Sequence, residues 1–325
     1  MRGKIFVLLL ATAFLANASF SQAQQPVKVP RIGFLATVSP STISSRVEAF
    51  RQGLRELGYV EGKNIVIEWR YAEGKPESEV AAELVDLKVD LIVTVGSPGT
   101  GAAKKATYTI PIVMAQDPDP VGNGYVASLA RPGGNITGLS SVAPELSGKR
   151  LELLKEAVPK LSRVAVLGTS TRLGNAQMLK EMALAAGTFG VRLQYLDILS
   201  SKDIEIAFRA ASKERAEAAL VFGGPVLNSH RTQIAELATK NRLPAIYERA
   251  EFMDAGGLMF YGASLTAMYR RAATYVDKIL KGAKPADLPV EQPTKFEFII
   301  NLKAAKQIGL TIPPNVLVRA NKVIK

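Results

Sequence analysis

Short apolar runs alternate with helical repeats along the first half of the chain. Val47, Phe50, Leu54 and Leu57 recur at helical spacing and predict a helix over residues 46–57. A second amphipathic pattern predicts a helix over 76–87. The apolar runs are short and rich in Ile, Val and Leu, and they predict buried strands at 31–35, 64–70, 90–95 and 110–115. Strands that are apolar throughout and separated by helices are typical of a parallel sheet covered on both faces.

The second half of the chain repeats this plan. Strands are predicted at 163–167, 191–198, 218–222 and 243–247, each about 130 residues after its counterpart. Coarse self-similarity is expected of any α/β chain, but glycine and proline follow the third strand in both halves, at 96–98 and 223–225. This matched break favours duplication. We therefore expect an α/β protein with two doubly wound parallel-sheet lobes.

The last part of the chain departs from the repeat. A long helix is predicted over 265–280, followed by a proline-spaced stretch over 285–293 and an apolar run at 296–302. We expect the helix to return to the first lobe and the tail to end on the second, with the crossings forming a hinge. Lobe 1 would then comprise 30–142 plus 265–290, and lobe 2 would comprise 143–264 plus 291–325.

The amino-terminal residues are typical of a secretory signal peptide. Arg2 and Lys4 precede an apolar run over 5–16, which small and polar residues follow as far as Ala23. We expect a signal peptide over 1–23, with cleavage after Ala23 or Ala18; an uncleaved N-terminal anchor is the alternative. The apolar run is shorter than the roughly 20 residues that cross a bilayer. The expected location is the periplasm.

Charge and cysteine content narrow the class of protein. The formal net charge is +12, and such a basic chain invites a nucleic-acid interpretation. Lys and Arg are scattered among acidic residues, however, so we expect no nucleic-acid partner, and attraction of acidic solutes or anionic surfaces instead. The chain has no cysteine. It can form neither a disulfide nor a thiolate metal site, and it lacks the cysteine of a lipid-anchored exported protein.

The loops that follow the predicted strands are the candidate binding positions. In a doubly wound parallel sheet, ligands lie beyond the carboxyl ends of the strands, where helix N-termini present unpaired N–H groups. The candidates in lobe 1 are Ser39, Ser41, Thr42, Ser97, Thr100, Gln116 and Asp117. The candidates in lobe 2 are Thr169, Ser170, Asn175, Gly223, Gly224, Tyr247, Glu248 and Tyr261.

Ser97 is the strongest of these candidates. The expected turn over 96–99 brings backbone close to a guest, and the helix that follows points its N-terminus at it, which suits a carboxylate. Alternatively, Ser97 or Thr100 caps its own helix.

Three further candidates have alternatives of their own. Asp117 or Glu248 could receive a solute ammonium; otherwise Asp117 supports the turn at the next proline, and Glu248 is a solvated charge beside an arginine. Tyr247 and Tyr261 could stack on a solute, or they form the edge of a core.

The inventory of catalytic and cofactor-binding motifs is poor. His230 is the only histidine, and its place at a predicted helix start favours a structural role. The G-x-S-x-G motif is missing. Residues 96–105 have the glycine spacing of a phosphate-binding loop, but Ala102 stands where the lysine is needed. We expect no enzyme activity, no cofactor and no metal site.

Long runs of the chain strongly resemble the ABC-transporter substrate-binding proteins of the tryptophan/tyrosine-type family. The runs are 49–70, 119–140, 145–167 and 270–314, and they include AFRQGLRELGYVEGKNIVIEWR and DPVGNGYVASLARPGGNITGLS. The resemblance implies a type I periplasmic-binding-protein fold that closes on an amino acid or small organic acid. It also implies a transient partner, an inner-membrane ABC permease, and a binding role for Ser97 and Asp117. We expect a monomer.

The loops of the second lobe depart from the family pattern. Residues 168–171 and 223–226 differ from the Asn-Pro-containing and Asp-Pro-Phe-like segments that are common there. Solute identity therefore does not follow from the resemblance. Two other functions stay open: a periplasmic ligand sensor of the same fold that presents its closed form to a membrane receptor, and an exported hydrolase or isomerase.

Overall fold

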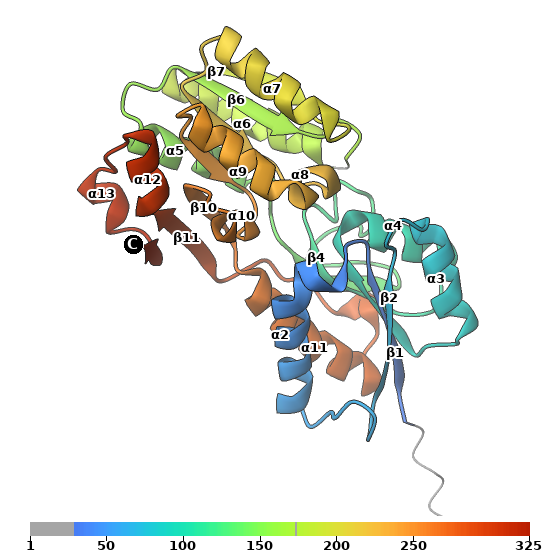
Figure 1. The fold of residues 1–325 in the computed structure, drawn as a ribbon. Helices are drawn as coiled ribbons and strands as arrows, with labels where there is room; N and C mark the ends of the chain where they lie inside the picture. Colours follow the sequence, from blue (N-terminus) through green and yellow to red (C-terminus); the bar gives the residue numbers. More distant parts are fainter. Residues whose placement is uncertain (1–28, 173) are drawn as a thin grey trace, which may run out of the picture.

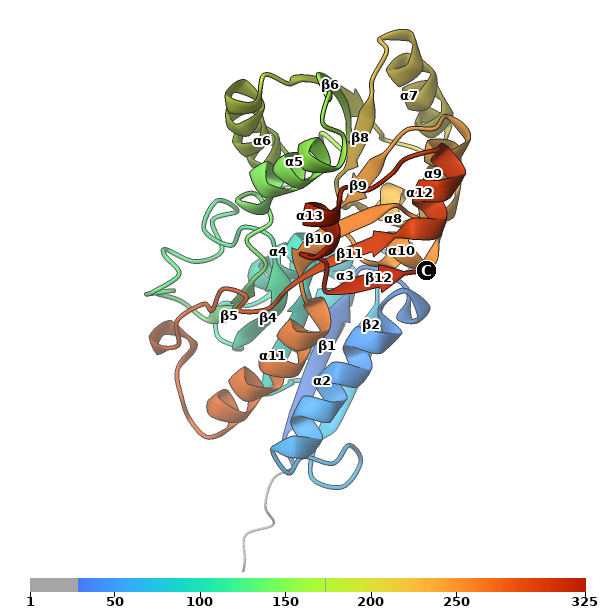
Figure 2. The same cartoon turned by 90° about the vertical axis from the view of Figure 1, so that its left-hand side faces the viewer.

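Two α/β lobes make up the part of the chain that the structure describes. The computed structural model describes residues 29–172 and 174–325, so the predicted signal peptide lies outside the described residues. Figures 1 and 2 show each sheet with its helices as a separate body, and connecting segments of the chain cross between the two bodies. Within the described ranges, no helix combines the length and the apolarity needed to span a membrane.

The first lobe is built on a five-stranded parallel sheet. Its strands are β1 (Arg31–Ala36), β2 (Val66–Tyr71), β3 (Leu91–Val95), β4 (Ile112–Asp117) and β5 (Ile136–Ser140). They lie in the order β2-β1-β3-β4-β5, and every neighbouring pair is parallel. All side chains of β3, β4 and β5 are buried, as expected of strands covered on both faces.

Helices cover both faces of this sheet. They are α2 (Ser44–Glu56), α3 (Glu77–Asp86), α4 (Gly96–Ala106) and α11 (Leu265–Leu280), with a short 3-10 turn η1 (Pro40–Ile43) before α2. Alternate residues of β1 divide between the faces: Ile32 and Phe34 share a core with α2 and α11, whereas Leu35 shares one with α3 and α4. The sheet is therefore the middle of three layers.

The second lobe has a seven-stranded sheet. Its strands are β6 (Arg163–Gly168), β7 (Arg192–Asp197), β8 (Ala218–Val221), β9 (Ala245–Tyr247), β10 (Met259–Ala263), β11 (Phe296–Asn301) and β12 (Lys322–Ile324). They lie in the order β12-β11-β10-β9-β8-β6-β7. All pairs are parallel except β10 with β11.

The helices of this lobe also form two layers. One core contains residues of α5 (Leu146–Ala157), α6 (Asn175–Phe189), α12 (Leu302–Ile308) and α13 (Pro314–Leu317). The other contains residues of α7 (Lys202–Lys213), α8 (Pro225–Ser229), α9 (Arg231–Lys240) and α10 (Glu251–Asp254).

The strand orders of the two lobes match. The run β7-β6-β8-β9-β10 in the second sheet has the same order as β2-β1-β3-β4-β5 in the first, with β11 and β12 added at its edge. This agreement is what duplication of one α/β unit predicts. The antiparallel β11 departs from the expected all-parallel sheet because the chain leaves this lobe at Ala263 and returns beside the same point at Phe296, so it must run back along β10.

The chain crosses between the lobes three times, after β5, after β10 and before β11. The helix α11 packs on α2 in the core of the first lobe, and Tyr275 donates a hydrogen bond to the Pro289 carbonyl oxygen after the 3-10 turn η2 (Pro285–Asp287). Glu291 still pairs with Leu139 of β5. We propose lobe boundaries of 30–142 plus 265–291 and 143–264 plus 292–325, which moves the boundary drawn from the sequence by one residue.

Candidate functional site

Two adjoining cavities lie between the lobes. The first, of about 90 Å³, is lined by the loop ends of the first sheet and by α4 on one side, and by loops after β6, β8 and β9 on the other. The second, of about 230 Å³, lies beside segments that cross between the lobes. Arg46, Arg249 and Glu251 line both cavities and therefore separate them.

A wider groove of about 720 Å³ lies between α2, α11 and residues 291–295. Among the described residues, none of the buried side chains with an unpaired polar atom lines it. Three such side chains, Gln116, Asn228 and Arg249, line the first interlobe cavity instead. A buried polar atom without a partner is costly, so a cavity that collects several is the better candidate for a binding site.

The N-terminus of α4 forms the wall of the first cavity on lobe 1. The expected turn over 96–99 is in fact the first turn of this helix, because proline is tolerated there, where its missing N–H would be unpaired anyway. Ser97 lines the cavity and does not cap the helix. Its hydroxyl oxygen accepts a hydrogen bond from the Asn123 side-chain amide at 3.0 Å. The first turn of a helix carries unpaired N–H groups and suits an anion.

Asp117 lies at the end of β4, beside this wall. It is fully buried, and its Oδ1 accepts hydrogen bonds from the Asp119 N–H and the Asn123 side-chain amide, both at 3.1 Å. Its Oδ2 has no partner. Burial raises the pKa of Asp117 to about 6, although the hydrogen bonds from Asp119 and Asn123 oppose the rise. Its neighbours Gln116 and Pro118 line the first cavity.

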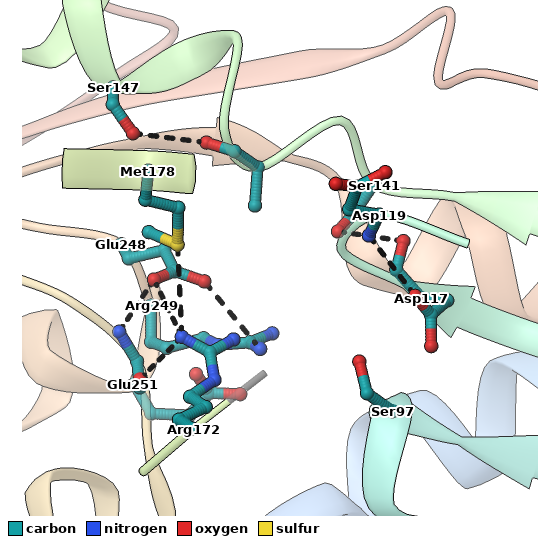
Figure 3. Close-up of polar contacts among 12 residues, drawn as sticks. Ser97, Asp117, Asp119, Ser141, Ser147, Arg172, Met178, Glu248, Arg249 and Glu251 are labelled. Carbon is teal, nitrogen blue, oxygen red and sulfur yellow. Dashed lines mark hydrogen bonds and ion pairs between the residues drawn. The ribbon is translucent and has the colours of Figure 1, made fainter. Parts of the chain in front are cut away.

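A buried charge cluster forms the opposite wall, on lobe 2. Glu248 follows β9, accepts a hydrogen bond from the Gly223 N–H at 2.6 Å, and lies 3.4 Å from Arg172 and 3.7 Å from Arg249. Burial alone would raise the pKa of Glu248, but the guanidinium groups of Arg172, Arg249 and Arg150 and the Gly223 hydrogen bond lower it to about 2. Figure 3 shows this cluster facing Ser97 and Asp117 across the space between the lobes.

One ion pair links the lobes directly at the site. Arg46 on α2 pairs with Glu251 on α10, and the side chains are 9% and 26% exposed. Because both residues line both cavities, the pair joins the lobes between them. Because the pair is partly desolvated, removing one partner would leave the other charge uncompensated in the interface.

The structure brings five of the predicted site residues to the cavities. Thr42, Ser97, Gln116 and Gly224 line the first cavity, and Glu248 lines the second. Glu248 is not the solvated charge considered above, since it is 7% exposed. It is also not free to receive an ammonium group, because Arg172 and Arg249 already share its carboxylate.

The remaining predicted residues do not line either cavity. The hydroxyl groups of Ser39 and Ser41 contact each other, Ser170 donates to Asp197, and Asn175 donates to Tyr195. The Thr100 hydroxyl donates to the Gly96 carbonyl oxygen within its own helix, so it neither caps α4 nor faces a solute.

Both tyrosines pack as core edges. Tyr247 is 1% exposed and stacks on Phe252, whereas Tyr261 stacks on Phe296. Aromatic stacking inside the lobe uses the ring faces that a solute would need.

Sequence reasoning missed the arginines of the site. Arg46, Arg172 and Arg249 line the first cavity, together with Arg231. Arg172 and Arg249 stand in the loops after β6 and β9, at the carboxyl ends of parallel strands, which is the position that should have identified them. The site offers hydrogen bonds and charge rather than metal binding: within residues 29–172 and 174–325, no group of three His, Asp or Glu side chains could hold a metal ion.

Comparison with known proteins places this architecture in a class. The structure resembles that of a conserved domain protein from Vibrio cholerae, with a TM-score of 0.85, 28% identity, and 91% of this chain and 100% of that chain covered. It also resembles an ABC domain from Streptococcus pneumoniae in complex with L-Trp, with a TM-score of 0.84, 26% identity, and 91% and 99% covered. The fold is that of a two-lobed binding protein of the type I periplasmic kind.

A family model described as ABC transporter substrate binding protein matches residues 31–324. The chain belongs to this family. A protein named tyrosine-binding protein, from Clostridioides difficile, is 26% identical over 285 residues, which cover 87% of this chain and 82% of that protein. The resemblance found in the sequence is thus confirmed, and the family consists of substrate-binding proteins rather than enzymes.

Proposed function

We propose that this protein is the extracytoplasmic solute-binding component of an ABC importer. It would capture a small solute that carries a carboxylate, an amino acid or a small organic acid, in the first interlobe cavity. The observation that carries the proposal is the set of buried, unpaired polar atoms lining that cavity from both lobes. These atoms are Oε1 of Gln116 on lobe 1 and Oδ1 of Asn228 and Nε of Arg249 on lobe 2.

Hinge closure follows from this distribution. A solute that pairs with atoms of both lobes makes contacts that are available only when the lobes are close, so it stabilises the closed form. The names of two relatives support an amino acid or a similar solute: one is called a tyrosine-binding protein, and another was crystallised in complex with L-Trp. The closed form would then be presented to a membrane permease.

The test is a ligand screen of the mature protein, residues 24–325. Thermal shifts are measured against amino acids and small carboxylic acids, and positive solutes are titrated by calorimetry. We expect micromolar binding of at least one solute, which corresponds to about −8 kcal/mol. Failure of every solute in both classes to stabilise the protein, together with turnover of one of them, would overturn the proposal.

A double variant tests the wall on lobe 1. Ser97→Ala with Asp117→Ala should abolish binding, because Ser97 lines the cavity and Asp117, which does not line it, accepts from the same Asn123 amide as Ser97. A cooperative unfolding transition should remain, because neither side chain holds the sheet together. Ser212→Ala with Asp86→Ala is the matched control, since both of its positions are exposed on helices. Unchanged affinity in the Ser97/Asp117 variant would remove this wall from the site.

Export is the second part of the proposal. The signal peptide expected over residues 1–23 and a periplasmic location can be checked by cell fractionation and by mass spectrometry of the amino terminus. We expect the mature chain to begin at Gln24 or Ser19. A chain that keeps Met1 and stays with the membrane fraction would show an uncleaved anchor instead.

A further inference from the structure

The second lobe has more positive charge at the cavity than its own carboxylate balances. Arg150, Arg172 and Arg249 surround Glu248, and within the described residues no other carboxylate lies within salt-bridge distance of these three guanidinium groups. Arg150 is 1% exposed and donates to the backbone carbonyl oxygens of Tyr261 and Ala143, so its hydrogen bonds are made within the protein. Arg172 and Arg249 are the two that face the first cavity.

These two arginines are incompletely paired. Arg172 donates to the Gly223 carbonyl oxygen at 2.6 Å and to Glu248 at 3.4 Å, and Arg249 reaches Glu248 only at 3.7 Å. The Nε of Arg249 is buried and has no partner. Burial lowers the pKa of Arg249 to about 10 even though Glu248 opposes the change, as expected of a buried cation with too little negative charge beside it.

The facing groups add no compensating negative charge. Arg46 and Glu251 neutralise each other, Arg231 lines the cavity and donates to the Asn228 carbonyl oxygen, and Gln116 is a neutral amide. The N-terminus of α4 faces the cavity with a partial positive charge.

Asp117 is the acidic group at the end of β4, next to Gln116 of the lobe 1 wall. It is fully buried and is not among the residues that line the cavity. The cavity wall itself therefore carries an excess of positive charge.

We propose that Arg172 and Arg249 form an anion subsite and that Arg172 selects a solute of net negative charge, a short aliphatic carboxylic acid. This inference rests on the proposed function and specifies its solute class. A guanidinium group pairs with a carboxylate through two parallel hydrogen bonds, which supplies both the missing charge and the missing acceptor for Nε. A zwitterionic amino acid brings no net charge and leaves the excess uncompensated.

The dimensions of the cavity agree with a short aliphatic solute. Its volume of about 90 Å³ is small beside the roughly 300–1,000 Å³ of sites for drug-sized ligands. Among the described residues that line it, Phe252 is the only aromatic one, and its ring is stacked on Tyr247. An indole or phenol side chain would find neither the space nor a free aromatic face there.

The experiment is calorimetric titration of the mature protein with acetate, succinate, glutarate, glutamate, tyrosine and tryptophan at constant ionic strength. We expect the four probes of net negative charge to bind at least tenfold more tightly than tyrosine or tryptophan. Arg172→Gln should weaken their binding at least tenfold, and Arg172→Lys should weaken it less, because lysine keeps the charge but not the paired hydrogen bonds.

Arg209→Gln is the matched control, since Arg209 lies on α7 with its side chain 69% exposed. It should bind as the unaltered protein does. The preference between solutes is measured on the unaltered protein, so it does not depend on how well the variants fold.

Two results would overturn the inference in different ways. Preferential binding of tyrosine or tryptophan, with equal affinity in the Arg172→Gln protein, would refute the anion subsite and leave the proposed solute-binding function standing. No binding of any of the six probes, by a protein with a cooperative unfolding transition, would count against both.

Discussion

Replacing Glu248 by glutamine tests the charge balance of the second lobe most directly. The carboxylate of Glu248 is the shared counter-charge of Arg172 and Arg249, at 3.4 Å and 3.7 Å, and it interacts electrostatically with Arg150. Glutamine keeps the shape and the acceptor for the Gly223 N–H but removes the charge. The guanidinium groups of Arg150, Arg172 and Arg249 would then have no carboxylate among them, so we expect a large loss of stability.

The magnitude follows from the pKa of Glu248. The pKa falls from an ordinary 4.5 to about 2 in the folded protein, a difference of roughly 2.5 units. At 1.36 kcal/mol per unit this amounts to about 3 kcal/mol, at the lower end of the 3–5 kcal/mol lost when one partner of a buried pair is removed. Because the folded pKa is lowered, this contribution is present above pH 4.5 and is lost as the pH falls toward 2.

Scanning calorimetry measures the effect. For a lobe of about 150 residues, a loss of about 3 kcal/mol at neutral pH lowers Tm by roughly 6–12 °C. The difference between Glu248→Gln and the unaltered protein should narrow below about pH 4.5. Glu236→Gln, at an exposed position of α9, is the control. A Glu248→Gln protein that melts within about 1 °C of the unaltered protein at pH 7 would refute the reasoning.

Three further substitutions test other parts of the structure. The raised pKa of Asp117, about 6, means that the folded protein favours the protonated form of this carboxyl group. Asp117→Asn should therefore increase the free energy of unfolding by up to about 3 kcal/mol at pH 8 and leave it unchanged below pH 3.8. Equal gains at both pH values in thermal melts would contradict this. Arg46→Met removes the ion pair with Glu251, so we expect the solute-free lobes to open and the radius of gyration in X-ray scattering to increase. Adding Glu251→Gln should increase the radius of gyration no further, and an additive increase would show that the two residues do not act as a pair. Gly138→Ala should lower the free energy of unfolding in urea by at least about 2 kcal/mol, since φ is +127° and a Cβ would lie 2.3 Å from a carbonyl oxygen of β4. Gly134→Ala is the control, because a Cβ there has open space. Equal urea midpoints for the two variants would contradict the prediction.

The apolar pattern predicted most of the fold because buried strands and amphipathic helices leave a local signal. The helix expected over 265–280 has those bounds in the structure. The first turn of α4 was missed, because Gly and Pro at 96–98 signal a turn in isolation and only the surrounding sheet decides for a helix. A local pattern also could not predict that β11 runs antiparallel to β10, since this depends on where the chain re-enters the second lobe.

The candidate site was predicted less completely, for a different physical reason. The rule that loops after parallel strands meet at one edge found five residues that line the cavities: Thr42, Ser97, Gln116, Gly224 and Glu248. It did not find Arg172 and Arg249, because an arginine in a loop is usually solvated and its burial depends on a carboxylate distant in the sequence. Arg172 and Glu248 are 76 residues apart.

Duplication and divergence together account for the form of the site. Two sheets of equal strand order present corresponding edges to each other, yet one edge offers a helix N-terminus and the neutral Gln116, and the other offers Arg172 and Arg249. Neither edge satisfies its own buried groups, and each unsatisfied group costs about 1–3 kcal/mol. To satisfy all three, a solute needs an acceptor for Nε of Arg249 and donors for Oε1 of Gln116 and Oδ1 of Asn228. On the proposed function, the lobes close because the solute completes hydrogen bonds that the fold leaves open.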